Sequence, residues 1–146
     1  MSVAQELYEG INLKKLGGVT GLITYMRTDS TRVSDEAVKM ASDYILNNFG
    51  KDYLATSIKS RKSSKNVQDA HEGIRPTNIN FTPDTIKEYL SNDQYKLYKL
   101  IWERFLASRM SAAVYETSTT TFENNKVVYR GAHSNLLFNG FLAVLK

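Results

Sequence analysis

The chain has 146 residues, enough for one ordinary domain or for one domain and a piece of another, and 42% of them are hydrophobic. It has no cysteine, which excludes disulfides and thiolate metal sites and fits an intracellular protein, and it has no membrane-spanning run or secretory signal. The net charge of +4 permits contact with nucleic-acid phosphates but does not by itself predict it.

Two amphipathic helices are predicted in the first third of the chain. The range Val3 to Lys15 has helical periodicity and ends at Gly17-Gly18. The second helix opens at Ser34, which can cap it, and two acids follow in the first turn, where they favour the helix dipole. Gly50 ends this helix. Its apolar stripe comprises Ala37, Val38, Ala41, Tyr44 and Ile45.

A basic, serine-rich segment follows at residues 57–66. Its four cations are Lys59, Arg61, Lys62 and Lys65. The composition is typical of a loop without a face to bury. It is either a flexible loop that contacts phosphates or a solvated linker, and the linker is the favoured interpretation.

Two more helices are predicted before the chain changes character. Thr82-Pro83-Asp84 opens a short helix through Leu90, with proline at the first helical position. Ser91 to Gln94 resembles a capping box and opens the longest helix, which runs to about Ala113 over roughly 30 Å. Its aromatic-rich face could stack on bases, but the spacing favours a buried core. That face comprises Tyr98, Ile101, Trp102, Phe105 and Leu106.

The remaining residues have the pattern of strands. The range Val114 to Phe122 is rich in threonine and β-branched residues, Glu123 to Lys126 is predicted to be a turn, and Val127 to Arg130 is the returning strand. Leu136 to Leu145, interrupted by Asn139-Gly140, is predicted to be a further strand. The chain is therefore predicted to be α+β, with helices first and strands last.

The most informative stretch lies between the first two helices, at residues 21–34. It places a tyrosine hydroxyl (Tyr25), a permanent cation (Arg27) and a carboxylate (Asp29) within five residues. An apolar lead-in, Leu22-Ile23, indicates a short strand that delivers these side chains to a polar site. The surrounding hydroxyl groups belong to Thr24, Thr28, Ser30 and Thr31.

This order of residues permits nucleophilic chemistry. Tyrosine, with an unperturbed pKa of about 10, attacks well only when a base takes its proton or positive charge favours the phenolate. The planar guanidinium of Arg27 can supply charge and suits a phosphate oxyanion. Attack on a phosphodiester conserves the bond energy, so strand breakage is reversible without ATP. The alternative from spacing alone is a tyrosine that packs its ring while Arg27 and Asp29 form a surface pair, and spacing alone favours this alternative.

Four ordered blocks give the chain a resemblance to a known family. They are Ala4–Gly10, the stretch Thr24–Thr31, the block Gln68–Thr77 (Gln-Asp-Ala-His-Glu-Gly-Ile-Arg-Pro-Thr) and Leu97–Phe105. Together they resemble the bacterial type IA DNA topoisomerases over nearly the whole chain. The resemblance implies a mostly helical tyrosine domain at residues 1–112, similar to the helix-turn-helix fold of catabolite activator protein. It also implies that residues 113–146 belong to a β-rich arch domain.

The resemblance also implies roles for individual residues. Tyr25 is then the nucleophile that joins a 5′ phosphate of single-stranded DNA, and Arg27 stabilises charge on the scissile phosphate. Asp29 and His71 are candidates for a paired polar element beside the strand. The remaining DNA-contacting candidates are Gln5 and Glu9, four apart on one helical face, and Thr24, Thr28 and Arg75, the two threonines positioning backbone or phosphate. The expected location is the bacterial cytoplasm, in association with the nucleoid.

Two differences from the family are visible. Gly73 stands where the family usually has alanine, within an expected helical turn, and glycine costs a helix roughly 1 kcal/mol. The acidic domain that binds Mg²⁺ in the family precedes this region and is not in the chain, so no cofactor or metal ligand is expected here and Mg²⁺ is expected only in the full-length enzyme. The family's zinc-binding cysteines are also missing, and we expect the isolated fragment to be inactive.

Three hypotheses follow. The chain is the catalytic-tyrosine part of a type IA topoisomerase, whose partners are single-stranded DNA and the other domains of the same enzyme, with no membrane. Alternatively, it is a non-catalytic module that binds single-stranded DNA. A weaker third option, a vestigial site in an interaction domain, is disfavoured by the intact Tyr25, Arg27 and His71.

Overall fold

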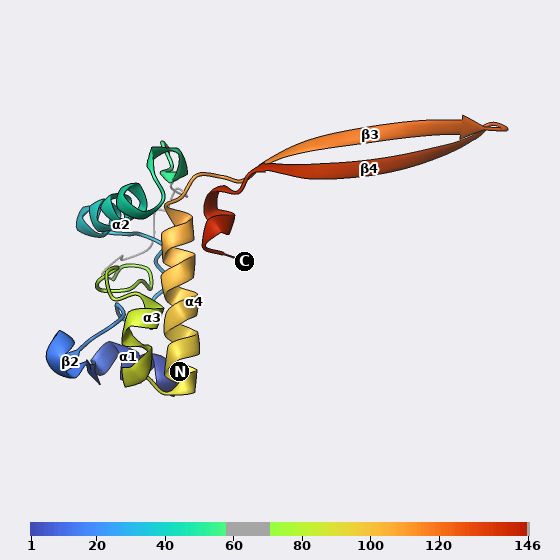
Figure 1. Cartoon of the computed structure of the whole chain (residues 1–146). Coiled ribbons are helices and arrows are strands. Elements are labelled where there is room, and N and C mark those ends of the chain that lie inside the picture. The colour runs from blue at the N-terminus through green and yellow to red at the C-terminus, as the bar shows by residue number, and fades with distance from the viewer. Residues whose placement is uncertain (58–70, 146) are drawn as a thin grey trace.

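The computed structural model describes residues 1–57 and 71–145. The basic segment predicted at residues 57–66 therefore lies, apart from Ser57, outside the described residues. The elements form a helical body, which we define as residues 1–57, 71–113 and 139–145, and a long hairpin that projects from it (Figure 1). The predicted α+β class is confirmed.

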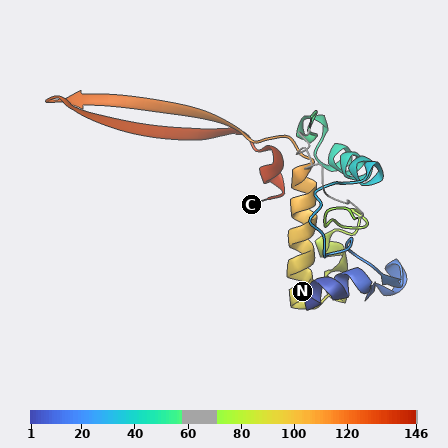
Figure 2. The ribbon, with the colours of Figure 1, turned by 180° about the vertical axis from the view of Figure 1, so that it is seen from behind.

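Helix α4 (Asn92–Ser108) is the central element of the body. The other helices are α1 (Ser2–Glu9), α2 (Asp35–Asn48) and α3 (Pro83–Ile86), and all three lie around α4 (Figures 1 and 2). Short 3₁₀ turns occur at Lys14–Leu16, Lys51–Tyr53, Lys87–Tyr89 and Gly140–Ala143. No helix in the described part of the chain is both long and apolar enough to cross a bilayer.

The predicted helix caps are confirmed. Ser34 accepts a hydrogen bond from the backbone of Ala37 at the start of α2, and Ser91 and Gln94 form the capping box of α4. Thr82 caps α3, whose first residue is Pro83.

The predicted aromatic face of α4 is core. Tyr98, Trp102 and Phe105 are buried, and the two polar ring atoms are satisfied: the Tyr98 hydroxyl donates to the Phe81 carbonyl (2.6 Å) and Trp102 Nε1 to the Ile79 carbonyl (3.0 Å). Burial raises the pKa of Tyr98 well above its ordinary value. These rings are therefore not available to stack on bases.

Helix α1 is shorter than predicted. It ends at Gly10, whose φ of 135° lies outside the helical range, and the predicted continuation to Lys15 is wrong. The chain instead forms a two-stranded sheet from β1 (Ile11–Asn12) and β2 (Val19–Thr20). Leu13, which directly follows β1, is buried in the core. The apolar residues that suggested helical periodicity belong to this small sheet and to the core.

Several further boundaries differ from the predictions. The helix predicted through Leu90 ends at Ile86, and a 3₁₀ turn follows it at Lys87–Tyr89. Helix α4 ends at Ser108 rather than near Ala113, and Met110 pairs with Leu54 in an isolated bridge. The predicted strand over Leu136–Leu145 is only partly correct: a strand ends at Phe138, and a 3₁₀ turn packs the following residues on the body. Gly140, with φ of 48°, makes this turn possible because any Cβ there would collide with the carbonyls of Ser111 and Ala112.

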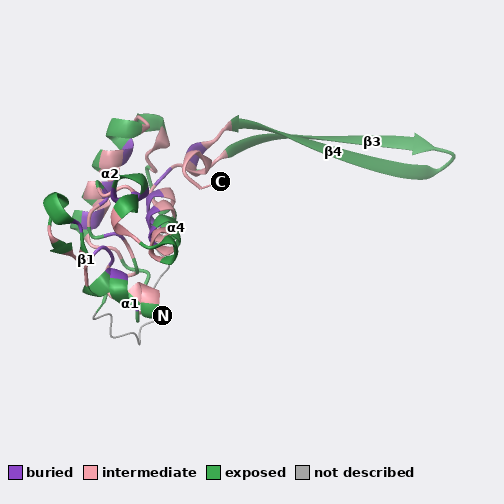
Figure 3. Ribbon diagram, turned by 60° about the horizontal axis from the view of Figure 1, so that its bottom comes forward, coloured by how far each residue is buried: buried purple, intermediate pink, exposed green. Residues whose placement is uncertain are grey.

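Strands β3 (Val114–Asn124) and β4 (Val127–Phe138) form the antiparallel hairpin. Its two-residue turn, Asn125-Lys126, has φ values of 52° and 66°, as the tight hairpin turns require. Nearly every residue of both strands is exposed (Figure 3).

Candidate active site

The segment that carries Tyr25, the tyrosine loop (residues 21–34), is mostly irregular rather than a strand. Leu22, Ile23 and Met26 are buried and anchor it in the core. A single β-bridge joins Ile23 to Pro76, and the Leu22 amide donates to the carbonyl of Leu7 in α1 (2.8 Å). The predicted short strand is therefore reduced to one bridge, yet the loop is fixed on both sides.

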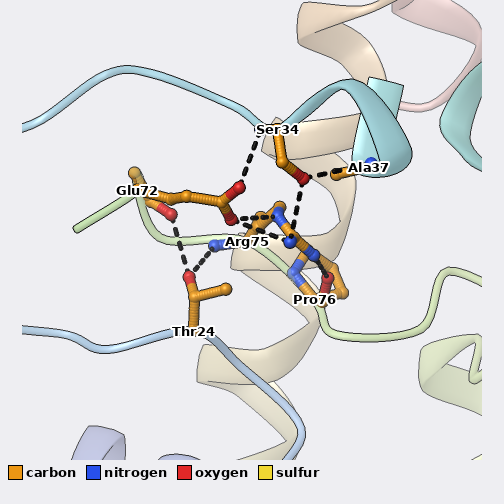
Figure 4. A network of polar contacts seen from close by, with 7 residues as sticks. Thr24, Ser34, Ala37, Glu72, Arg75 and Pro76 are labelled. Atoms are coloured by element: carbon orange, nitrogen blue, oxygen red, sulfur yellow. Dashed lines mark hydrogen bonds and ion pairs between the residues drawn. The ribbon is translucent and has the colours of Figure 1, made fainter. Parts of the chain in front are cut away.

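A second segment, which we call the clamp loop (residues 71–77), lies against the tyrosine loop (Figure 4). The backbone amide of Thr24 donates to the Arg75 carbonyl (2.9 Å), and that of Thr77 donates to the Leu22 carbonyl (3.0 Å). The Thr24 hydroxyl donates to the Gly73 carbonyl (2.8 Å) and accepts from the Arg75 amide (3.0 Å). Thr24, which directly precedes Tyr25, thus joins the tyrosine loop to the clamp loop.

Tyr25 is half-buried between two other rings. Its ring lies 5.4 Å from that of Tyr8 in an edge arrangement and 4.8 Å from the imidazole of His71. Three separate segments (α1, the tyrosine loop and the clamp loop) therefore meet at Tyr25. Tyr8 and His71 are themselves exposed, so the site lies at the surface of the body.

The charged residues after Tyr25 are exposed. Among residues 1–57 and 71–145, no hydrogen bond or ion pair engages the side chain of Arg27 or Asp29. They do not form the surface pair that was the alternative interpretation, and no polar contact joins Asp29 to His71 within the same ranges. Thr28 accepts a hydrogen bond from the Ser30 amide (3.1 Å) and so shapes the loop backbone.

Gln5 and Glu9 lie on one face of α1, as predicted. Gln5 Nε2 donates to Glu9 Oε1 (2.8 Å), and both side chains are exposed. Tyr8 lies on the same helix and contacts Tyr25 directly, but the sequence interpretation missed it. Its position, three residues after Gln5 and so on the same helical face, was the available signal.

Arg75 is held inside the protein rather than displayed on it. Its Nε donates to Glu72 Oε2 (2.8 Å), its Nη2 lies 2.7 Å from the same oxygen, and its Nη1 donates to the Pro76 carbonyl (3.0 Å). Glu72 Oε1 accepts from the Ser34 amide (2.8 Å). Sequence reasoning missed Glu72, although an acid three residues before an arginine indicates such a pair.

The pKa of Glu72 reflects two opposing effects. Partial burial raises the pKa of the carboxyl, but hydrogen bonds from Arg75 and Ser34 and the charge of Arg75 outweigh it and hold the pKa below its ordinary value. Glu72 is therefore ionised at neutral pH and pairs with the permanent cation of Arg75.

The predicted helical turn around Gly73 is wrong, because residues 71–77 contain no helix. The Gly73 amide donates to the Arg32 carbonyl (2.8 Å), and a Cβ on Gly73 would lie 3.2 Å from the Ser30 carbonyl oxygen. Glycine at this position thus allows the backbones of the two loops to approach closely. Alanine requires a shift of a few tenths of an ångström there, not the repair of a helix.

The described residues do not fit a magnesium site of their own. No group of three or more His, Cys, Asp or Glu side chains in this part of the chain could hold a metal ion. The two acids that follow Ser34 occupy the first turn of α2, where they favour its dipole.

Comparison with known proteins assigns the family. The sequence profile of the family described as DNA topoisomerase matches residues 1–146, and the chain belongs to that family. The DNA topoisomerase 1 of Fervidobacterium islandicum is 51% identical over an alignment of 146 positions, which covers 97% of this chain and 21% of that protein. The full-length topoisomerase I from Thermotoga maritima superposes with a TM-score of 0.84 at 41% identity, over 100% of this chain and 23% of that one. The resemblance to the bacterial type IA enzymes is confirmed, and the chain spans about a fifth of the length of these relatives.

Proposed function

We propose that this chain is the catalytic-tyrosine region of a type IA DNA topoisomerase. The whole enzyme then relaxes negatively supercoiled DNA, without ATP, by cutting one strand, passing the other through the gap and resealing the cut. The observation that carries this proposal is the site itself: Tyr25 stands on a fixed loop between Tyr8 and His71, two residues before a cation with no partner among the described residues.

In the proposed step the Tyr25 oxygen attacks a DNA phosphorus while the bond from phosphorus to the 3′ oxygen breaks. The tyrosine proton passes to a base, and the leaving 3′ oxygen takes up a proton. Arg27 stabilises charge on the phosphoryl oxygens. The product is a 5′-phosphotyrosine and a free 3′ hydroxyl, and the reverse reaction reseals the strand because the ester energy is conserved.

We propose that the DNA strand lies over the exposed groups around Tyr25, which are Gln5, Glu9, Asp29 and His71. Thr24 and Thr28 act through the backbone, since their hydroxyls already bind within the protein. We further propose that the full-length enzyme uses Mg²⁺ held by residues outside this chain, where the ion supplies charge near the phosphate. The partners are single-stranded DNA and other domains of the same enzyme, in the bacterial cytoplasm at the nucleoid.

The test is covalent capture on a single-stranded oligonucleotide labelled at its 3′ end. The chain is assayed alone, and then as a chimera in which residues 1–146 replace the matching part of the Fervidobacterium enzyme, with Mg²⁺ present. We expect a labelled adduct only from the chimera. Tyr25→Phe, which removes one oxygen, abolishes the adduct while single-strand affinity stays within about twofold, since tyrosine-to-phenylalanine changes outside buried bonds are small.

An active Tyr25→Phe chimera would place the nucleophile elsewhere. If the unmutated chimera binds DNA but yields no adduct, the chain is a non-catalytic module for single-stranded DNA, which is the second hypothesis.

A further inference from the structure

The pairing of Glu72 with Arg75 raises the question of what this arginine does. A phosphate-binding arginine needs free donors in its planar fork. Here Nε and Nη2 both face Glu72 Oε2, Nη1 donates to the Pro76 carbonyl, and Nη2 also lies 3.5 Å from the Ser34 hydroxyl. Only 15% of the side chain is exposed. The guanidinium is occupied by the protein.

Glu72 binds two partners, one through each of its carboxylate oxygens. Oε2 binds Arg75 of the clamp loop, and Oε1 accepts from the amide of Ser34, the residue at which the tyrosine loop ends and α2 begins. Ser34 in turn caps α2. The carboxylate therefore fixes the clamp loop to the far end of the tyrosine loop (Figure 4).

The near end of the tyrosine loop is fixed by Thr24. Its hydroxyl binds Gly73 and Arg75 in the clamp loop, directly before the nucleophile. His71 begins the clamp loop and directly precedes Glu72, so its position over the Tyr25 ring, 4.8 Å away, depends on where this loop lies. Among the described residues, the His71 side chain packs against that ring and forms no hydrogen bond.

We propose that Glu72 and Arg75 are positioning residues that set His71 against Tyr25, and that Arg75 is not a phosphate ligand. This inference rests on the proposed role of Tyr25. Loss of the pair lets the clamp loop move, so His71 leaves the ring and the nucleophile loses its fixed surrounding. Misplacement by about 1 Å can cost roughly a hundredfold in rate.

The first measurement needs no catalysis and uses the 146-residue chain itself. Nuclear Overhauser effects between the His71 and Tyr25 rings are expected in the unmodified chain. They should be lost in Glu72→Gln and in Arg75→Ala, while ring contacts in the core, such as Tyr44 with Trp102, persist and show that the variants fold. Persistence of the His71–Tyr25 signals in both variants would overturn the proposal.

The second measurement uses the chimera with the Fervidobacterium enzyme and separates positioning from phosphate binding. The dependence of single-strand affinity on salt is measured with an oligothymidylate probe. A lost phosphate contact lowers the slope of log affinity against log salt by roughly 0.7. We expect no change for Arg75→Ala and a reduced slope for Arg27→Ala. A slope that falls equally in both variants would make Arg75 a phosphate ligand.

The third measurement is the rate of single-turnover cleavage in the same chimera. Glu72→Gln and Arg75→Ala should each slow cleavage about ten- to hundredfold. The double variant should be no slower than the worse single one, because the two residues act as a unit. Arg75→Lys keeps the charge but not the fork, so it should resemble Arg75→Ala.

Thr24→Val provides an independent variant with little change in shape. It removes the hydroxyl that joins the loops, and we expect the same loss of ring contacts with an unchanged salt slope. Strictly additive rate losses, or an Arg75→Lys variant as fast as the parent, would overturn the inference. An unmutated chimera that does not cleave refutes the proposed function instead, and leaves the ring-contact measurement to decide the positioning.

Discussion

The helical body and the β3–β4 hairpin differ in how far they bury their apolar side chains. In the body, α4 buries four side chains against neighbouring elements, and the polar atoms of the buried rings find partners in loops. In the hairpin, each strand pairs with the other and with no further strand among the described residues, and large apolar side chains such as Phe122 (61% exposed) and Tyr129 (59%) remain exposed. A two-stranded hairpin is marginal in water without a packed face. The body therefore contains the determinants of its own fold, whereas the hairpin contributes little to it.

The largest effect we expect compares one phenylalanine in each region. Phe105→Ala, at a residue with 5% exposure, should lower the free energy of unfolding by about 3–5 kcal/mol. Phe122→Ala, the same change on the hairpin, should stay within about 0.5 kcal/mol because most of that residue is exposed to solvent. Urea unfolding followed by the fluorescence of Trp102, the single tryptophan, measures both. Equal losses would show that the hairpin and the body unfold as one unit.

The second prediction concerns exposure that has a different cause. The hairpin is exposed because, among the described residues, its two strands pair with each other and with no further strand, but Arg27 is exposed on a loop that the buried Leu22, Ile23 and Met26 anchor in the core. If Arg27 stabilises charge on the phosphate, Arg27→Ala in the chimera should slow cleavage roughly 10²- to 10³-fold. Arg32→Ala, at the exposed end of the same loop, is the matched control and should change the rate little. An Arg27→Ala rate equal to that of the control would remove its assigned role.

The third prediction uses the polar network that only the body possesses. Because the pKa of Glu72 is lowered in the folded state, its ionisation stabilises the fold above the ordinary value of 4.5, and this stability is lost as the pH falls through the lower, folded-state pKa. The unmodified chain should thus lose stability on acidification more steeply than Glu72→Gln. Unfolding free energies between neutral pH and about pH 3 test this, since the window lies at and below the unfolded value.

The matched control for Glu72 is a second ion pair between residues close in sequence, on the exposed surface of α4. Lys99 and Glu103 lie 3.8 Å apart on the surface of α4, with 47% and 27% of their side chains exposed. Exposed pairs of this kind contribute about 0.3–0.5 kcal/mol. Glu103→Gln should therefore leave the pH dependence nearly unchanged. If the stability of both variants depends on pH in the same way, the Glu72–Arg75 pair stabilises the fold no more than a surface pair does.

The difference between the regions also explains what the sequence could predict. Capping residues and helical periodicity gave α2, α3 and α4 because those signals are local. The end of α1 was misplaced because the apolar residues after Gly10 enter a sheet and the core, and periodicity cannot separate that from a longer helix. The hairpin turn lies within the predicted range Glu123 to Lys126, but β4 extends to Phe138 and so is much longer than the predicted returning strand, Val127 to Arg130.

The site was predictable only in part, for a related reason. Tyr25, Arg27 and Asp29 form a dense local pattern, so they could be singled out from one stretch of sequence. The contacts of Tyr8 and Glu72 depend on three segments meeting, and such contacts leave only weak traces in the spacing of residues. The resemblance made Arg75 a candidate DNA contact, and the sequence showed no clear sign that its donors are directed to Glu72 and Pro76. The side-chain partners of an arginine depend on how segments meet in the fold, so they could not be predicted from one stretch of sequence.

The smallest predicted effect sharpens the account of the hairpin. Lys126 occupies the second turn position with φ of 66°, a left-handed conformation that costs a non-glycine residue roughly 1 kcal/mol. Lys126→Gly creates the preferred Asn-Gly turn and should stabilise the hairpin by up to about 1 kcal/mol, or roughly fivefold in amide exchange protection. Lys126→Ala, which removes the long side chain but keeps Cβ, should give no such gain.

The amide exchange of the paired residues Thr119 and Ala132 reports the opening of the hairpin, and that of the α4 amides reports the opening of the body. Protection that rises in the hairpin alone means that the two regions open independently, because a shared unfolding unit transmits the stabilisation to α4 as well.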